Sequence, residues 1–289
     1  MDWFTEPLQQ IHIQRALFIC VLAGFTNGYL SAFVVLRKSA LQVGSLSHTL
    51  LPGIALGVLL FGISQASLFS GALLAALIVG VGSLLIARSS RLDQETALAI
   101  LYTTAFAGGV VMMEFAPVDI DIDQFLFGNI LFAGPADLQT VFWVSLIALS
   151  VLTALRRPLI LMLFEPSAAR AAGVPVRAMN YLLLGLLILV LISTLQAVGC
   201  LLALGLLVTP AATVYLLTDR VEVLFWGGGV LGAVSATFAL FLSHHQDIGT
   251  GPAIILTLGA LFFVAWIFSP KYGLLAGLVS RLRRPVEAS

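Results

Sequence analysis

RKSALQVGSLSHTLLPG (residues 37–53) is the stretch around which the rest of the chain is organised. His48 lies in it, four residues before Pro52. Because proline has no backbone N–H, the carbonyl of His48 loses its usual helical partner, and Pro52 with Gly53 predicts a break in the helix. An ionisable side chain in a membrane segment beside a broken helix indicates a transport pathway. The alternative for His48 is a packed, hydrogen-bonded histidine.

The composition places the chain in a lipid bilayer. It has 289 residues, of which 60% are hydrophobic and only 10% are charged, and its mean hydropathy is +1.08. A soluble core cannot hide that much apolar surface, and several apolar runs approach the roughly 20 residues that cross a membrane. We expect an all-α polytopic membrane protein. About nine transmembrane helices are predicted, at residues 16–36, 45–61, 67–87, 97–115, 138–155, 179–198, 199–217, 223–242 and 253–268.

Charged residues predict the orientation of these spans. With the N-terminus outside and the C-terminus inside, all but one of the 14 basic residues lie on the inner side. More than half of the 14 acidic residues then lie outside. Because the inner loops of membrane proteins are enriched in Lys and Arg, the sequence predicts an N-out, C-in topology.

Glycine pairs at four-residue spacing recur within the spans. Such pairs allow helix backbones to approach closely in lipid, where apolar surface alone does not drive helices together. We expect close helix contacts at these positions, although ordinary packing needs no further role for them. The pairs are Gly24 and Gly28, Gly53 and Gly57, and Gly228 and Gly232.

The longest inner loop contains a short segment bounded by proline and glycine. Residues 166–172 are rich in alanine, begin at Pro166 and are followed by Gly173. Proline favours the first turn of a helix, and glycine favours its end. A short cytoplasmic helix is therefore expected within residues 163–178. An interfacial amphipathic helix and a docking element for a partner both remain open.

Several stretches stand out in order between about residue 6 and about residue 269: QRAL (14–17), FVVLRKSAL (33–41), SHTLLPGIALG (47–57), FLFGNIL (125–131), VGCLLALGLLVTPAA (198–212) and IILTLGALFF (254–263). In this order they resemble the manganese, zinc and iron permeases of ABC importers. The most specific of them is VGCLLALGLLVTPAA (198–212). The resemblance implies a single transmembrane permease domain over residues 1–289, in the bacterial cytoplasmic (inner) membrane, that imports a divalent transition metal such as zinc, manganese or iron.

The resemblance also implies the partners. They are a cytoplasmic ATP-binding subunit, an extracytoplasmic metal-binding protein, and a second copy or a paralogue of the permease, all within or beside membrane lipid and without nucleic acid. Neither Lys38 nor Lys271 follows a glycine, so the chain has no GxxxxGK[ST] phosphate loop. We expect a transport subunit and not an enzyme, with no cofactor of its own and with ATP on the partner. Coupling to that partner is implied for Glu165, Ala168, Ala169 and Gly173.

The resemblance implies that His48 binds the passing metal. In the family, an aspartate four residues before this histidine lies on the same helix face, but the chain has Gly44 there. Ser45 and Ser47 are possible weak ligands, because a neutral hydroxyl holds a hard divalent cation less well than a carboxylate does. Water, a carbonyl or the partner permease could complete such a site.

Two polar clusters are expected at the outer mouth. Asp119, Asp121 and Asp123 alternate along the chain, and either a solvated acidic loop or a docking surface for the binding protein fits them. His244, His245 and Asp247 offer nitrogen and oxygen donors for zinc or manganese, although adjacent histidines do not readily share one ion.

Two other transporter classes are alternatives. A siderophore- or cobalamin-type ABC permease agrees with the missing intramembrane carboxylate, but such chains are usually longer and have ten spans. An ion-coupled secondary metal carrier needs buried acids, and no Asp, Glu, Lys or Arg lies well inside a predicted span.

Overall fold

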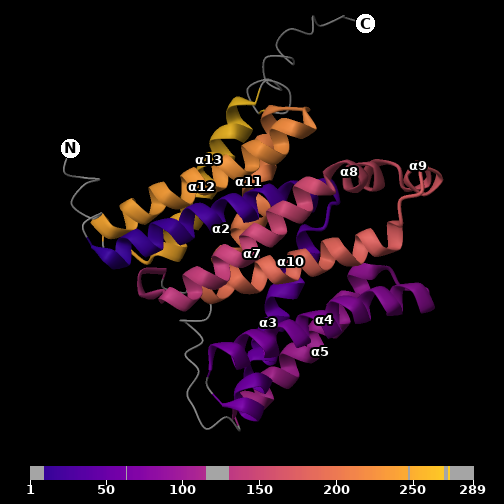
Figure 1. Cartoon of the computed structure of the whole chain (residues 1–289), viewed down its shortest axis with the longest axis horizontal. Coiled ribbons are helices and arrows are strands. Elements are labelled where there is room, and N and C mark those ends of the chain that lie inside the picture. Colours follow the sequence, from indigo (N-terminus) through magenta and orange to yellow (C-terminus); the bar gives the residue numbers. More distant parts are fainter. Residues whose placement is uncertain (1–9, 63, 115–129, 247, 270–272, 274–289) are drawn as a thin grey trace, which may run out of the picture.

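The structure is a computed structural model that describes residues 10–62, 64–114, 130–246, 248–269 and 273. All secondary structure in these residues is helical, as the sequence predicts (Figure 1). Eight of the described helices are long and apolar enough to cross a membrane. They are α2 (Ile11–Leu36), α3 (Ala40–Phe61), α4 (Gln65–Ser89), α5 (Gln94–Glu114), α7 (Pro135–Ala154), α10 (Val176–Val198), α12 (Val221–Gln246) and α13 (Thr250–Phe268).

A further apolar helix, α11 (Cys200–Leu217), is shorter than these eight. It follows α10 directly, because Gly199 has a φ of 98° and turns the chain sharply without a loop. α11 packs against α2, α12 and α13. A polytopic membrane protein is therefore confirmed, while a ninth crossing at α11 stays a prediction.

α3 differs from the sequence prediction. It begins at Ala40 and continues through Pro52 to Phe61, so the expected helix break is absent. α5 explains how the proline is accommodated, since a Cβ on Gly109 would lie only 2.4 Å from the Cβ of Pro52. Packing of the proline ring against the bare backbone of Gly109 thus stabilises the helix where a hydrogen bond is lost.

The expected close contacts at glycine pairs are confirmed. A Cβ on Gly28 would lie 2.2 Å from the carbonyl oxygen of Gly228, so α2 and α12 touch backbone to backbone. Gly53 meets α4 in the same way, with 2.4 Å from its Cβ position to the carbonyl oxygen of Gly71. No other residue type fits these contacts, and small residues therefore determine which helices are neighbours.

α2 is the most deeply buried helix, and hydrogen bonds join it to α10 and α11. Asn27 donates from Nδ2 to the Thr194 hydroxyl oxygen at 2.7 Å. The Ser31 hydroxyl donates to the Val208 carbonyl at 3.0 Å and accepts from the Ala211 N–H at 3.2 Å. The bond from the Ala211 N–H lies beside Pro210, a residue that has no backbone N–H of its own.

The segment between α7 and α10 contains two short helices. α9 (Pro166–Ala171) begins and ends close to the predicted residues, with Gly173 at a φ of 79°. α8 (Arg156–Phe164) precedes it and was not predicted, because its basic start resembles a loop in the sequence. Arg156 forms an ion pair with Glu222 at the start of α12, which ties α8 to the helical bundle.

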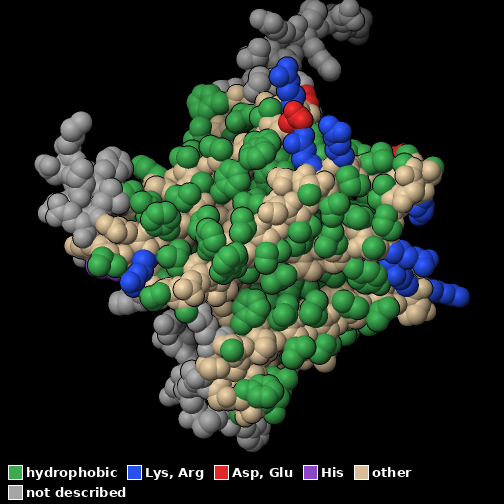
Figure 2. Space-filling view, viewed as in Figure 1, with side chains coloured by type: hydrophobic (Ala, Val, Ile, Leu, Met, Phe, Trp, Pro, Cys, Tyr) green, Lys and Arg blue, Asp and Glu red, His purple; other side chains and the backbone are tan. Residues whose placement is uncertain are grey.

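Hydrophobic side chains cover most of the visible face of the molecule (Figure 2). Leu256, Ile78 and Trp143 are among the large apolar side chains that are more than half exposed, as is usual only for a surface in contact with lipid. Most Lys and Arg side chains in this view lie toward one end of the helices, where α8, α9 and the first turn of α10 are found. This separation supports the expected topology without testing its direction.

Candidate functional site: an open cavity at His48

His48 faces an open cavity that four helices form. The cavity has a volume of about 570 Å³, and its wall comes from α3, α5, α11 and α13. The side chain of His48 is exposed rather than packed in the core. The other polar side chains in the wall are Ser45, Tyr102 and Thr209. The wall thus brings one imidazole and three hydroxyl groups to one open space and is otherwise apolar.

Two aromatic rings of α5 surround the imidazole of His48. The ring centroid of Tyr102 lies 6.3 Å away, and that of Phe106 lies 6.2 Å away with its ring nearly perpendicular to the imidazole. These contacts orient the ring, while no described residue forms a hydrogen bond with either of its nitrogens. Both nitrogens therefore remain available to a ligand in the cavity.

The two serines beside His48 point in different directions. Ser47 is only 1% exposed, and its hydroxyl donates to the Gly44 carbonyl at 2.7 Å. Ser45 lies in the cavity wall and donates to the Leu41 carbonyl at 3.0 Å, which leaves its oxygen lone pairs free to accept or to coordinate. Of the two, Ser45 is better positioned to assist His48.

Gly44 also lies in the cavity wall, one helical turn before His48. A Cβ added at Gly44 would meet only the Cδ1 atom of Leu204, at an ordinary contact distance of 3.8 Å. A side chain at position 44 would thus fit without clash and would lie on the same helix face as His48.

Thr209 and Tyr102 were missed by sequence reasoning. Thr209 falls within residues 198–212, the stretch with the most specific resemblance, and it immediately precedes the helix-internal Pro210. A polar residue beside an intramembrane proline is the signal that could have identified it. Tyr102 carries no comparable signal, because a tyrosine in an apolar helix usually indicates packing.

A second cavity adjoins the first and shares Leu41, Ser45 and Tyr102 with it. Its volume is about 350 Å³, and the start of α5 supplies Asp93 and Glu95 to its wall. Asp93 accepts hydrogen bonds from the N–H and hydroxyl of Thr96, which hold the pKa of this carboxyl below its ordinary value. The two cavities together connect His48 with the end of the helices where α5 begins.

The outer-mouth histidines lie in a helix rather than in the expected loop. His244 and His245 belong to the last turn of α12, with ring centroids 5.5 Å apart and nearly perpendicular rings. Nδ1 of His245 lies 2.8 Å from the Phe241 carbonyl, so that nitrogen is already engaged. Asp247, Asp119, Asp121 and Asp123 lie outside the described residues.

The residues expected to couple to a partner divide into buried and exposed ones. Ala169 is fully buried and packs into the main hydrophobic core, whereas Glu165, Ala168 and Gly173 are exposed. Ala169 therefore attaches α9 to the helical bundle, while the other three residues lie on the outside of the molecule. Within the described part of the chain, no three His, Cys, Asp or Glu residues come together as a metal cluster.

Comparison with known proteins finds relatives over nearly the whole chain. The sequence model of the ABC 3 transport family matches residues 9–269. The manganese transport system membrane protein MntC of Halalkalibacterium halodurans is 35% identical over 274 residues, covering 94% of this chain and 92% of the relative. The chelated iron transport system membrane protein YfeC of Yersinia pestis is 29% identical over 276 residues, covering 96% of this chain and 92% of the relative.

A solved structure extends the similarity to three dimensions. PsaBC from Streptococcus pneumoniae, in complex with Fab, matches with a TM-score of 0.83 and 29% sequence identity. The match covers 95% of this chain and 98% of that chain, so it includes the helices that form the His48 cavity. The similarity therefore concerns a whole membrane subunit rather than a shared fragment.

Proposed function

Because the chain belongs to the ABC 3 transport family and is the membrane permease of a metal-importing ABC transporter, we propose that its cargo is the manganese ion. Relatives that are 35% and 33% identical over more than nine-tenths of the chain are named as manganese transport proteins. A relative of the chelated iron system is somewhat less similar, at 29% identity. The chemistry of the cavity supports this cargo, since one imidazole among hydroxyl groups is a hard to borderline donor set without thiolate.

The observation that carries the proposal is the position of His48 in an open cavity among α3, α5, α11 and α13. One imidazole is too few ligands for a resting manganese site, and the described residues bring no second His, Cys, Asp or Glu into a three-membered cluster there. Water and a second permease, either a copy or a paralogue, would supply the remaining ligands. A weakly held ion suits passage, because a transported ion must leave the site as readily as it enters.

The remaining parts of the proposed importer have separate places on the chain. α9, with Glu165 and Ala168 exposed, would dock onto a cytoplasmic subunit that binds and hydrolyses ATP. The outer acidic residues Asp119, Asp121 and Asp123 would meet the extracytoplasmic binding protein that delivers the metal. The proposed importer subunit has nine spans, with the N-terminus outside and the C-terminus inside, in a bacterial inner membrane.

His48→Ala tests the proposal directly. The imidazole is the only nitrogen donor in the described cavity wall, so its loss should lower uptake of radioactive manganese at least about tenfold while the complex still assembles. His12→Ala is the matched control, because His12 is also exposed on a transmembrane helix but lies outside the cavity. Uptake by the His48 variant at the rate of the His12 variant would remove His48 from the pathway.

A further inference from the structure

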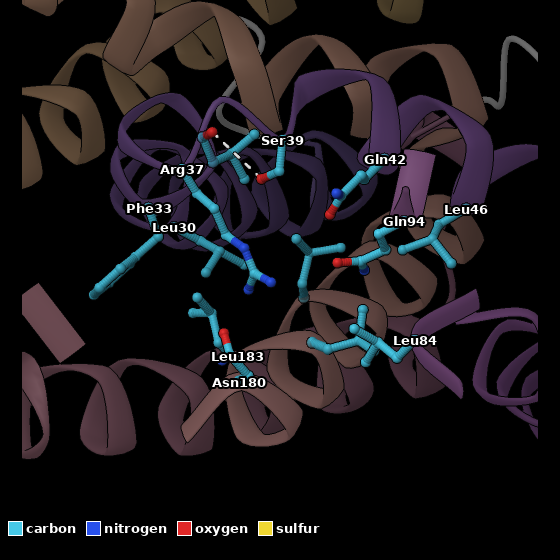
Figure 3. Close-up of a pocket in the computed structure, with 13 residues that line it drawn as sticks. Leu30, Phe33, Arg37, Ser39, Gln42, Leu46, Leu84, Gln94, Asn180 and Leu183 are labelled. Carbon is cyan, nitrogen blue, oxygen red and sulfur yellow. Dashed lines mark hydrogen bonds between the residues drawn. The ribbon is translucent and has the colours of Figure 1, made fainter. Parts of the chain in front are cut away.

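A second, more enclosed cavity lies at the corner between α2 and α3. Figure 3 shows the Arg37 guanidinium near its centre, with the amide groups of Gln42 and Gln94 on one side and that of Asn180 on another. These side chains come from the end of α2 and from the first turns or starts of α3, α5 and α10. The cavity has a volume of about 20 Å³. Five helices meet around it, since Leu84 of α4 also forms part of the wall.

Of the polar side chains in this cavity, Ser39 donates to the Val34 carbonyl, whereas the other four have no partner among the described residues. The Arg37 guanidinium forms neither a hydrogen bond nor an ion pair with them. The side-chain amides of Gln42, Gln94 and Asn180 are likewise without a hydrogen bond in the described part of the chain. Arg37 is half-buried, and burial lowers the pKa of its guanidinium. A partly desolvated cation with three free amides around it is an arrangement that native proteins rarely leave unfilled.

The donors in the cavity predict an anionic oxygen ligand. A guanidinium offers only N–H donors, and each amide adds an NH₂ group, so the site can give several hydrogen bonds to one acceptor. A cavity of about 20 Å³ holds roughly one water-sized group, which fits a single projecting oxygen atom and not a whole free phosphate. A water molecule could satisfy the amides, but it would leave the charge of Arg37 uncompensated.

The location of the cavity identifies the source of that oxygen. It lies where α2 ends and α3, α5 and α10 begin, next to Lys38 in the chain, and the neighbouring helix ends carry Arg88 and Arg177. Apart from Ser39, its remaining wall is apolar, with Leu84 and Leu183 both buried. Anionic phospholipids bind membrane proteins at the level of the lipid headgroups, where basic side chains lie beside the apolar sides of helices.

We propose that the cavity at Arg37 binds a phosphate oxygen of an anionic phospholipid from the adjacent leaflet. The guanidinium and the amides of Gln42, Gln94 and Asn180 hold the oxygen, and the rest of the headgroup lies at the mouth of the cavity. The lipid then links the end of α2 to the starts of α3, α5 and α10. The inference goes beyond the transport of manganese and does not depend on which metal is carried.

Lipid binding to the purified, assembled permease tests the proposal by native mass spectrometry, with phosphatidylglycerol and phosphatidylcholine as probes. The wild-type permease should bind phosphatidylglycerol more tightly than phosphatidylcholine. Arg37→Gln should bind phosphatidylglycerol at least about tenfold more weakly than wild type, because charge-assisted hydrogen bonds are removed. Lys38→Gln removes the neighbouring charge outside the cavity wall and should keep the preference. Asn180→Leu leaves the charge of Arg37 in place and should weaken the binding of phosphatidylglycerol a few-fold. This variant tests the proposal if the Arg37 variant does not assemble.

Three results would overturn the proposal. Equal losses in Arg37→Gln and Lys38→Gln would indicate general attraction to a basic surface. Displacement of phosphatidylglycerol by inorganic phosphate at comparable concentration would make the site one for free phosphate. The lipid could also be released when the ATP-binding subunit is added, while that subunit protects Arg37 from chemical modification. This result would assign the cavity to an acidic side chain of the partner.

Discussion

Gly44 is a single residue that affects how strongly the proposed metal pathway can hold an ion. It occupies the position one turn before His48, in the wall of the same cavity, and its Cβ position is open except for the contact of 3.8 Å with Leu204. The chain thus keeps space for a side chain that it does not have. In the proposed metal pathway this absence would weaken binding, because His48 then has only neutral oxygen donors beside it.

Gly44→Asp is predicted to tighten manganese binding at least about tenfold. The new carboxylate would lie on the same helix face as His48, and charge as well as a hard oxygen ligand would be added. The dissociation constant of the purified complex, measured by equilibrium dialysis, checks the prediction. Gly44→Asn is the control, since it has the same size without the charge. Equal affinities of the Asp and Asn variants would contradict a shared role with His48.

Single residues also show where sequence reasoning stops. His48 was predicted because it is an ionisable residue in an apolar segment beside Pro52 and because of the family resemblance. The structure places it in an open cavity, although the helix continues through Pro52, and its role in metal passage stays a prediction. Arg37 was counted only as a charge in a loop, since its isolation among three amides depends on helices that are far apart in sequence. The separation of Ser45 from Ser47 likewise depends on the exact rotation of α3, which begins earlier than predicted.

At the scale of helices, glycine pairs carry most of the specificity of packing. The spacing of Gly24 with Gly28 and of Gly228 with Gly232 was visible in the sequence, but not which pairs would meet. In the structure α2 pairs with α12, and α3 pairs with α4. The helix spans can be predicted from hydropathy alone. Which helices become neighbours depends on how their surfaces fit together, and no single position in the sequence shows this.

Gly28→Ala is predicted to destabilise the permease by about 1–3 kcal/mol, as overpacking at a tight contact does. Its methyl group would lie 2.2 Å from the Gly228 carbonyl oxygen, so α2 and α12 would have to separate. The melting temperature in detergent measures the loss. Gly185→Ala in α10 is the matched control, because nothing lies within 4 Å of its Cβ position, and it should be neutral or slightly stabilising. A melting temperature for Gly28→Ala equal to that of the control would refute the backbone contact.

At the scale of the whole molecule, the functional parts lie at different depths along the helices. The His48 cavity continues into the cavity that Asp93 and Glu95 line, and α9 lies beyond the helix ends on the side where basic residues gather. A motion of α9 can reach the bundle through buried Ala169 and through the Arg156–Glu222 ion pair of the preceding α8. This contiguous route is what a permease needs if a separate subunit supplies the energy.

Ala168→Arg is predicted to lower manganese uptake by disturbing the contact between α9 and the ATP-binding subunit. Ala168 is exposed on α9, so the bulky cation should disturb docking of the ATP-binding subunit without disturbing the fold. Uptake should fall at least about tenfold while the amount of permease in the membrane stays normal. Ala169→Arg should instead reduce the amount of folded permease, because Ala169 is fully buried in the main core and an unpaired charge there is costly. Both quantities can be followed in the same cells by metal uptake and by immunoblotting of membranes. Normal uptake by the Ala168 variant would show that α9 is not the docking site of the ATP-binding subunit. The coupling surface would then have to lie elsewhere on the inner face.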